Sequence, residues 1–286
     1  MKLLTTMVLG ASLAALQSAA LHAQDGTLLA RGKYLMEGPV ACGNCHMTRG
    51  AQGQPLPEKG LSGGMLFDEP PFKAYAANIT PDKKTGIGNW SEAQLAKAIR
   101  EGIRPDGSVI GPPMPIGFYR SISDQDLKAI VTYLKAQPAV ANPVPKSQYH
   151  MPLPPNYGPP VGKIATPPSS NKVKYGEYLA QISHCMECHT PRDAKGMLQL
   201  DQLGAGGQNF KGPWGESVSA NLTPVAEGLK NWSDAEIAAA IRTGKDNQGY
   251  PLKPPMGFAF YEHISESDMG ALIAYLRSLK PQKSPH

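Results

Sequence analysis

The chain has 286 residues, a formal net charge of +5, 30 glycines, 28 prolines and only 18% charged residues. This length suits two domains of about 100–150 residues each, and the glycine and proline content favours short helices with much loop between them. No cluster of lysine and arginine is dense enough for a nucleic-acid-binding surface, so a nucleic-acid partner is excluded.

The N-terminus has the order of a secretory signal. In MKLLTTMVLGASLAALQSAALHAQ, Lys2 precedes an apolar stretch, and small residues follow it. This segment is too short and too rich in small residues for a membrane-spanning helix. We assign residues 1–23 to a signal peptide, which predicts a periplasmic protein that meets the membrane only through a partner. An uncleaved N-terminal anchor is the alternative.

Two long stretches of the chain repeat each other. ANITPDKKTGIGNWSEAQLAKAIREG, residues 77–102, recurs as ANLTPVAEGLKNWSDAEIAAAIRTG at 220–244. PPMPIGFYRSISDQDLKAIVTYLKA, residues 112–136, recurs as PPMGFAFYEHISESDMGALIAYLRS at 254–278. The offset between matching residues changes by a single position along the chain, which indicates an internal duplication.

A proline-rich segment separates the two copies. Ten prolines fall between residues 138 and 168, and proline removes a backbone donor and fixes φ, so this segment cannot be a helix interior or a central strand. It is expected to run extended over the surface. We therefore place the first domain at residues 24–140, the linker at 141–169 and the second domain at 170–286.

Helical signals recur at matching places in the copies. A serine followed three residues later by a glutamine or glutamate forms a capping box, which marks the start of a helix. Short helices are expected over 28–37 and 174–183, and further helices are expected to begin after Ser91, Ser123, Ser233 and Ser265. No alternating pattern of useful length indicates a strand. The fold class expected for each copy is all-α.

Both copies open with a related tetrapeptide, GKYL at 32–35 and GEYL at 176–179. Each tetrapeptide falls in the first expected helix of its copy. We expect Tyr34 and Tyr178 to pack where the first and last helices of a copy cross. This is a structural task, so neither tyrosine is expected to bind a ligand.

All four cysteines lie in two C-x-x-C-H motifs, which end at His46 and His189. This spacing is the signature of covalent haem attachment, in which two thiols add to the haem vinyl groups and the histidine ligates iron. A thioredoxin-like pair would need a βαβ pattern, and a zinc site would need more ligands. We predict two covalently bound haem c groups, attached at Cys42, Cys45, Cys185 and Cys188.

Two methionines occupy matching positions in the repeat. Met114 lies in GPPMPIGF and Met256 in KPPMGFAF, both in proline-flanked loops before the last helix. A lone methionine more often fills a core, but the repetition favours both as the sixth ligands of iron. Histidine and methionine together are a common ligand pair in electron transfer and raise the reduction potential. The predicted iron ligands are His46, Met114, His189 and Met256.

Other polar side chains near the motifs have less distinctive patterns. His184 directly precedes the second motif, where the first copy has Ala41, and is expected to be a polar surface residue. Asn78 and Asn221, in ANIT and ANLT, either hydrogen-bond haem propionates or cap a turn. The turn is favoured, because asparagine commonly caps turns.

Each copy resembles a small monohaem cytochrome c domain, with a GxYL helix, C-x-x-C-H, a methionine loop and a final helix containing YL. NITPD…GIGNWSEAQLAKAIREG and ISESDMGALIAYLRSL are similar to the cytochrome c subunits of periplasmic alcohol, gluconate and aldehyde dehydrogenase complexes. The resemblance implies a dehydrogenase as electron donor and an oxidase or another cytochrome as acceptor. Those subunits commonly have three haem domains and a C-terminal membrane-associating segment, whereas two domains are recognised here and the chain ends in LKPQKSPH.

Two functions are compatible with two haem groups. The first is a periplasmic dihaem carrier that passes single electrons from a dehydrogenase to a downstream respiratory acceptor and has no catalytic residues. The alternative is a dihaem enzyme, either a peroxidase or a thiosulfate-type oxidoreductase, which would need one open iron position with acid–base residues beside it. Both copies keep the methionine loop, and no paired carboxylates or distal histidine stand out. The carrier is therefore favoured.

Overall fold

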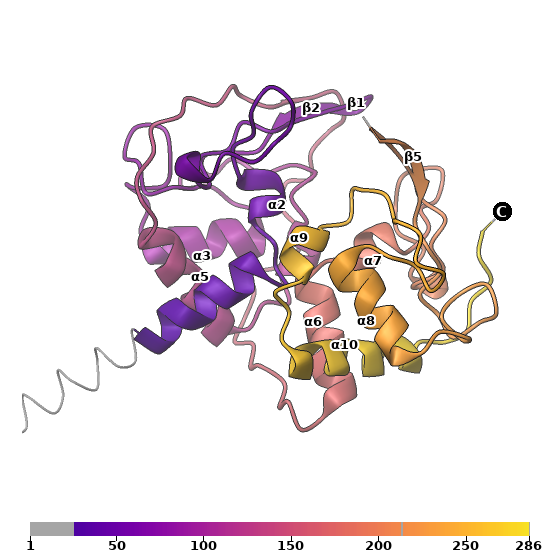
Figure 1. Cartoon of the computed structure of the whole chain (residues 1–286). Coiled ribbons are helices and arrows are strands. Elements are labelled where there is room, and N and C mark those ends of the chain that lie inside the picture. The colour runs from indigo at the N-terminus through magenta and orange to yellow at the C-terminus, as the bar shows by residue number, and fades with distance from the viewer. Residues whose placement is uncertain (1–25, 213, 286) are drawn as a thin grey trace, which may run out of the picture.

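The computed structural model describes residues 26–212 and 214–285. The predicted signal peptide, residues 1–23, lies outside the described residues. In Figure 1 the indigo-to-magenta half of the chain and the orange-to-yellow half form two lobes packed against each other. Within the described part of the chain, no helix has both the length and the apolar character needed to cross a bilayer.

Helices appear in the same order in both lobes. The first lobe begins with a helix described over residues 26–37, followed by α2 (Gly43–His46), α3 (Glu92–Glu101), α4 (Ile116–Tyr119) and α5 (Asp124–Lys135). The second lobe contains α6 (Lys172–Ile182), α7 (Cys185–Cys188), α8 (Asp234–Thr243), α9 (Phe258–Tyr261) and α10 (Glu266–Ser278). Short 3₁₀ turns lie at Pro57–Lys59 and Leu200–Gln202. The duplication in the sequence is therefore a duplication in the structure.

The predicted capping boxes form at the start of α3 and α8. The backbone N–H of Gln94 donates to the hydroxyl of Ser91, while the Ser91 N–H donates to the Gln94 side chain at 2.8 Å. Ser233 and Glu236 make the same reciprocal pair. These bonds satisfy donors that the first turn of a helix leaves unpaired. A left-handed glycine ends each of the two helices.

The glycine of the GxYL tetrapeptides allows two close helix crossings. A Cβ atom at Gly32 would overlap the carbonyl oxygen of Ala129 in α5, and one at Gly176 would overlap the carbonyl oxygen of Ala271 in α10. Any side chain at these positions would push the helices apart. The tetrapeptide thus fixes the contact between the first and last helices of each lobe.

Short strands qualify the prediction of an all-α fold. β1 (Leu66–Glu69) and β2 (Phe72–Tyr75) form an antiparallel hairpin, and β4 (Asn209–Gly212) and β5 (Gly215–Val218) form its counterpart. The linker adds β3 (Gln148–Tyr149) to the free edge of β2. Helices dominate each lobe as expected, but the expected absence of strands is wrong. Four-residue strands are too short to give a visible alternating pattern.

The linker lies against the first lobe as an extended strap. No helix occurs among residues 141–169, all of which are described. The hydroxyl of Tyr149 donates to the carbonyl of Pro112 at 3.1 Å, and that of Tyr157 donates to Ile110 at 2.7 Å. The linker therefore covers the loop that contains Met114.

The lobes contact each other through reciprocal hydrogen bonds. The hydroxyl of Tyr34 donates to Asp268 in α10, and that of Tyr178 in α6 donates to Asp126 in α5, both at 2.7 Å. Within the first lobe, Arg31 forms an ion pair with the carboxylate of Asp126 at 2.8 Å, the same side chain that accepts from Tyr178. The prediction placed the two tyrosines at helix crossings within one copy, whereas their hydroxyls bind acceptors in the other lobe.

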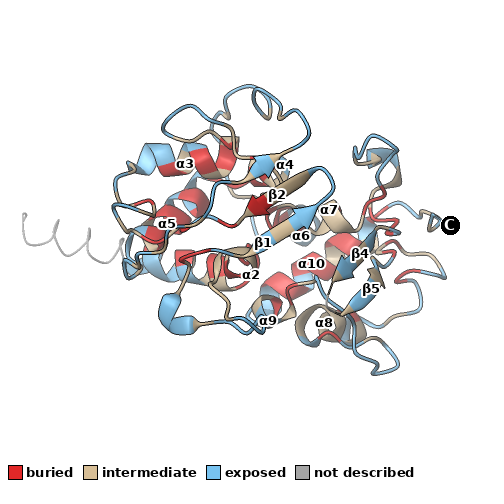
Figure 2. Cartoon of the chain, turned by 90° about the horizontal axis from the view of Figure 1, so that it is seen from above, coloured by how far each residue is buried: buried red, intermediate tan, exposed pale blue. Residues whose placement is uncertain are grey.

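The hydrophobic core is continuous between the lobes. One cluster of buried residues contains Leu35 and Ile130 from the first lobe and Leu179 and Ile182 from the second. Figure 2 shows the buried residues on the inward faces of the helices, whereas β1, β4 and β5 are largely exposed. The hydrophobic interior thus joins the two repeats into one packed unit.

Candidate functional site

Each lobe contains a large cavity beside its C-x-x-C-H motif. The cavity of the first lobe has a volume of about 300 Å³ and that of the second about 440 Å³. Their walls are mainly apolar. In the second lobe they include Leu222, Leu229, Ile237, Ile241 and Leu272. Cavities of this size with apolar walls and few polar groups suit a flat hydrophobic cofactor.

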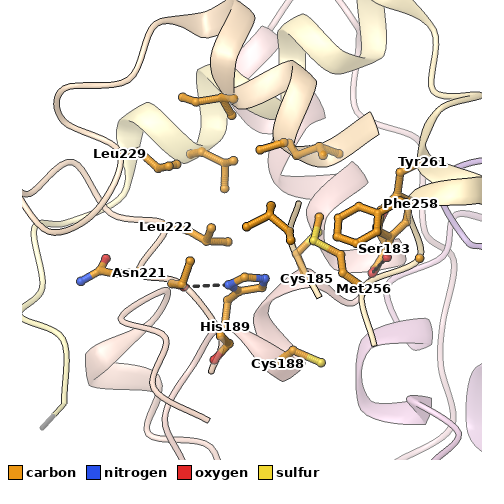
Figure 3. Close-up of a pocket in the computed structure, with 18 of the residues that line it drawn as sticks. Ser183, Cys185, Cys188, His189, Asn221, Leu222, Leu229, Met256, Phe258 and Tyr261 are labelled. Atoms are coloured by element: carbon orange, nitrogen blue, oxygen red, sulfur yellow. Dashed lines mark hydrogen bonds between the residues drawn. The ribbon is translucent and has the colours of Figure 1, made fainter. Parts of the chain in front are cut away.

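The structure brings the predicted site residues of each copy together. The first cavity is lined by Cys42, Cys45, His46 and Met114. The second cavity is lined by Cys185, Cys188, His189 and Met256. Figure 3 shows that the side chains of Cys185, His189 and Met256 lie around one central space in the second lobe. Sequence and structure therefore agree on which side chains meet, while the role of each stays a prediction.

A sharp turn positions each motif. Ala41 and His184 have left-handed backbone conformations, with φ values of 50° and 44°. Such values are uncommon for residues with a side chain, and here both copies keep them. The turn directs the chain into α2 or α7, each about one turn long. In α2 the N–H of His46 donates to the carbonyl of Cys42 at 3.0 Å, with the equivalent bond in α7.

The motif histidines are oriented by one hydrogen bond each. The distance between Nδ1 of His46 and the carbonyl oxygen of Ala77 is 2.8 Å, and the same distance separates His189 from Ala220. A carbonyl oxygen can only accept, so Nδ1 has the hydrogen and Nε2 keeps its lone pair. Burial lowers the pKa of both histidines. The rings are thus neutral, as a metal ligand must be.

The four cysteines form no disulfide bond with one another and lie partly buried beside the cavities. Burial is the largest cause that raises the pKa of Cys42 to about 12, and it does the same for Cys185. Reactive redox cysteines instead have lowered pKa values and lie in electropositive surroundings. Cysteine side chains that form no disulfide and lie against an apolar cavity fit thioether formation with a cofactor that fills the cavity.

Both methionine loops are held in place, by different means. Tyr149 from the linker bonds Pro112 in the loop of Met114. In the second lobe the hydroxyl of Ser217, on β5, donates to the carbonyl of Pro254 at 2.6 Å. Met256 follows two residues later. Each methionine is therefore presented to its cavity on a fixed loop, which suits a weak ligand.

The asparagines of ANIT and ANLT cap turns, as favoured from the sequence. The side-chain oxygen of Asn78 accepts from the backbone N–H and the hydroxyl of Thr80 at 2.9 and 2.7 Å. Asn221 and Thr223 repeat this pattern. These turns follow Ala77 and Ala220, so they also fix the carbonyls that orient the motif histidines.

The prediction that His184 is a surface residue is wrong. Its side chain is half-buried and lines both cavities, as does that of Asn44. The ring packs edge-on against Tyr119 of the first lobe, with 6.1 Å between ring centroids. Burial lowers its pKa to about 4. The repeat pattern could not indicate this, because the position is an alanine in the first copy and its surroundings come from the other lobe.

Comparison with known proteins identifies the family. The sequence model of the cytochrome c family matches residues 29–138 and 173–280. The chain is 32% identical, over 88% of its length, to the fructose dehydrogenase cytochrome subunit of Gluconobacter japonicus, 52% of which is covered. It is 30% identical, over 93% of its length, to the cytochrome c subunit of alcohol dehydrogenase (quinone) of Gluconobacter oxydans, with 58% of that protein covered.

A third relative is similar in length. The chain is 29% identical over 82% of its length to a diheme cytochrome c-type protein of Cereibacter sphaeroides, 81% of which is covered. The chain spans about half the length of the two dehydrogenase subunits. It belongs to the cytochrome c family, with two cytochrome c domains in tandem. Its cofactors are two covalently bound haem c groups, and the two cavities fit them.

Proposed function

We propose that the chain is a periplasmic dihaem cytochrome c that passes single electrons from a dehydrogenase to a downstream respiratory acceptor. The observation that supports it most is the same in both lobes. A neutral histidine with its Nε2 available and a methionine on a fixed loop line one apolar cavity. With two protein ligands on each iron, no position is open for a substrate, which favours a carrier over a catalyst.

Each side chain of the site then has a distinct role. Cys42 and Cys45 attach one haem by thioether bonds, as Cys185 and Cys188 attach the other. The iron ligands are the four residues His46, Met114, His189 and Met256. A neutral thioether favours ferrous iron, so this ligand pair raises the reduction potential.

The donor and the acceptor are proposed from the relatives. Two of them are cytochrome subunits of a fructose dehydrogenase and an alcohol dehydrogenase, which supports a dehydrogenase as donor. An oxidase or another cytochrome would accept the electrons. The signal-like sequence of residues 1–23 supports export to the periplasm. Redox partners of this kind meet through small, weak interfaces.

The absorption spectrum of the oxidised protein tests this function. We expect two low-spin haem groups with a methionine-to-iron charge-transfer band at the red end of the visible spectrum. Brief exposure to cyanide or hydrogen peroxide should leave the spectrum unchanged. A high-spin component that reacts rapidly with peroxide would contradict the carrier and support a dihaem peroxidase.

A further inference from the structure

We infer that the two haem sites share one wall, in which Asn44 and His184 lie, and that electrons pass between the lobes across this wall. The inference rests on the proposed function and extends it to the internal route. Transfer then means that one iron goes from ferrous to ferric while the other goes from ferric to ferrous. Both side chains line both cavities.

The wall contains one residue from each C-x-x-C-H region. Asn44 lies between Cys42 and Cys45, and His184 directly precedes Cys185. The side that faces the other lobe is therefore the side where the cofactor is attached. In the repeat, Asn44 corresponds to Glu187, so the wall is not built from equivalent positions.

Close contacts between the lobes surround the wall. A Cβ atom at Gly43 in α2 would lie 2.7 Å from the ring of Phe260 in α9. One at Gly257, next to the second methionine, would lie 3.4 Å from the side-chain nitrogen of Asn44. These distances exclude a solvent layer at those points, so the motif helix of the first lobe packs directly on the methionine loop region of the second.

On the other side of the wall, His184 of the second lobe packs against the first lobe. The ring of His184 packs on Tyr119 of α4, which is 5% exposed. The hydroxyl of Tyr119 donates to the carbonyl of Val40, and that of Tyr261 donates to Ser183, both at 3.3 Å. Each tyrosine thus supports the turn that leads into the motif of its own lobe.

The wall adjoins both cavities, because Asn44 and His184 line each of them. Charges interact strongly across a short distance in a desolvated region. A charge in the wall should therefore act on both redox centres.

Redox titration of charge variants of the holoprotein tests the shared wall. Asn44→Asp is nearly isosteric and adds a negative charge, which favours ferric iron, so both midpoint potentials should shift to lower values. Arg104 lines only the first cavity and Lys253 only the second. Arg104→Gln should lower one potential and Lys253→Gln the other, which also assigns each potential to its lobe.

The outcomes separate this inference from the function on which it rests. If Asn44→Asp lowers one potential or neither while two haem groups remain attached, the shared wall is wrong. If the wild-type chain has no haem spectrum, the proposed function fails first. If the variant does not fold, electron paramagnetic resonance of the wild-type protein tests whether the two haem sites are adjacent. We expect magnetic interaction between the two ferric centres, and a spectrum equal to the sum of two isolated centres would overturn the inference.

Discussion

At His46 and His189 a single hydrogen bond decides which ring nitrogen can reach the cavity. The carbonyls of Ala77 and Ala220 accept from Nδ1, so Nε2 keeps its lone pair for the proposed bond to iron. The proposed ligand role of Met114 and Met256 depends on their thioether sulfur, so a substitution that removes the sulfur tests it directly.

Replacing one methionine should change one haem only. Met114→Ala removes the proposed sixth ligand of the first haem, so the reduction potential of this haem should fall and its iron should bind cyanide. Met256→Ala should do the same to the second haem. Redox titration and cyanide difference spectra measure both effects. An unchanged potential in either variant would show that its methionine is not an axial ligand.

The glycine in GKYL should tolerate no side chain. Gly32→Ala would place a methyl group against the backbone of α5 and should lower the free energy of unfolding by about 1–3 kcal/mol. Gly270→Ala is the matched control, because Gly270 is exposed within α10 and its added Cβ would meet nothing within 4 Å. It should raise stability by about 0.5–1 kcal/mol. Denaturant unfolding of both variants measures this, and equal stabilities would contradict the close crossing.

At the scale of elements, the linker holds the methionine loop of the first lobe, and the second hairpin holds that of the second lobe. The linker strand β3 extends the sheet of the first lobe and brings Tyr149 onto the methionine loop. The second lobe instead uses Ser217 from its own strand β5. Gly111 allows Tyr149 to lie against the methionine loop of the first lobe, because any Cβ at position 111 would overlap the ring of Tyr149. The matching position in the second copy is Lys253.

Loosening one methionine loop should therefore affect one haem. Tyr149→Phe keeps the ring and removes a hydrogen bond of about 1 kcal/mol, so cyanide should bind one of the two haem groups about fivefold faster. Ser217→Ala should accelerate the other haem by a similar factor. Stopped-flow mixing of the ferric protein with cyanide resolves the two phases. Acceleration of both phases by either variant would contradict separate fastening of the loops.

For the molecule as a whole, the buried contact between lobes predicts a single cooperative unfolding transition. Tyr178→Phe removes a buried hydroxyl that donates to the carboxylate of Asp126 across the contact, and should cost about 1.5–3 kcal/mol. Tyr250→Phe, at an exposed position, should change stability by less than about 0.5 kcal/mol. Calorimetry tests this: two separate transitions in the wild-type protein would show that the lobes are independent.

The sequence was sufficient for the features that depend on local or repeated residues. Duplication, capping boxes, the C-x-x-C-H motifs and the methionine loops could all be predicted, because each has its own spacing. The place of His184 and the partners of Tyr34 and Tyr178 could not. These depend on how one copy packs on the other, and no pattern within a copy encodes that contact. The short hairpins were missed because four residues show no periodicity.

The most direct test is the intact mass of the wild-type protein, measured after denaturation so that only covalent groups remain. Two haem masses on each chain are predicted, and one after replacement of Cys42 and Cys45 by serine. A polypeptide without added mass would contradict the dihaem cytochrome, and so would a second haem that persists in the double variant.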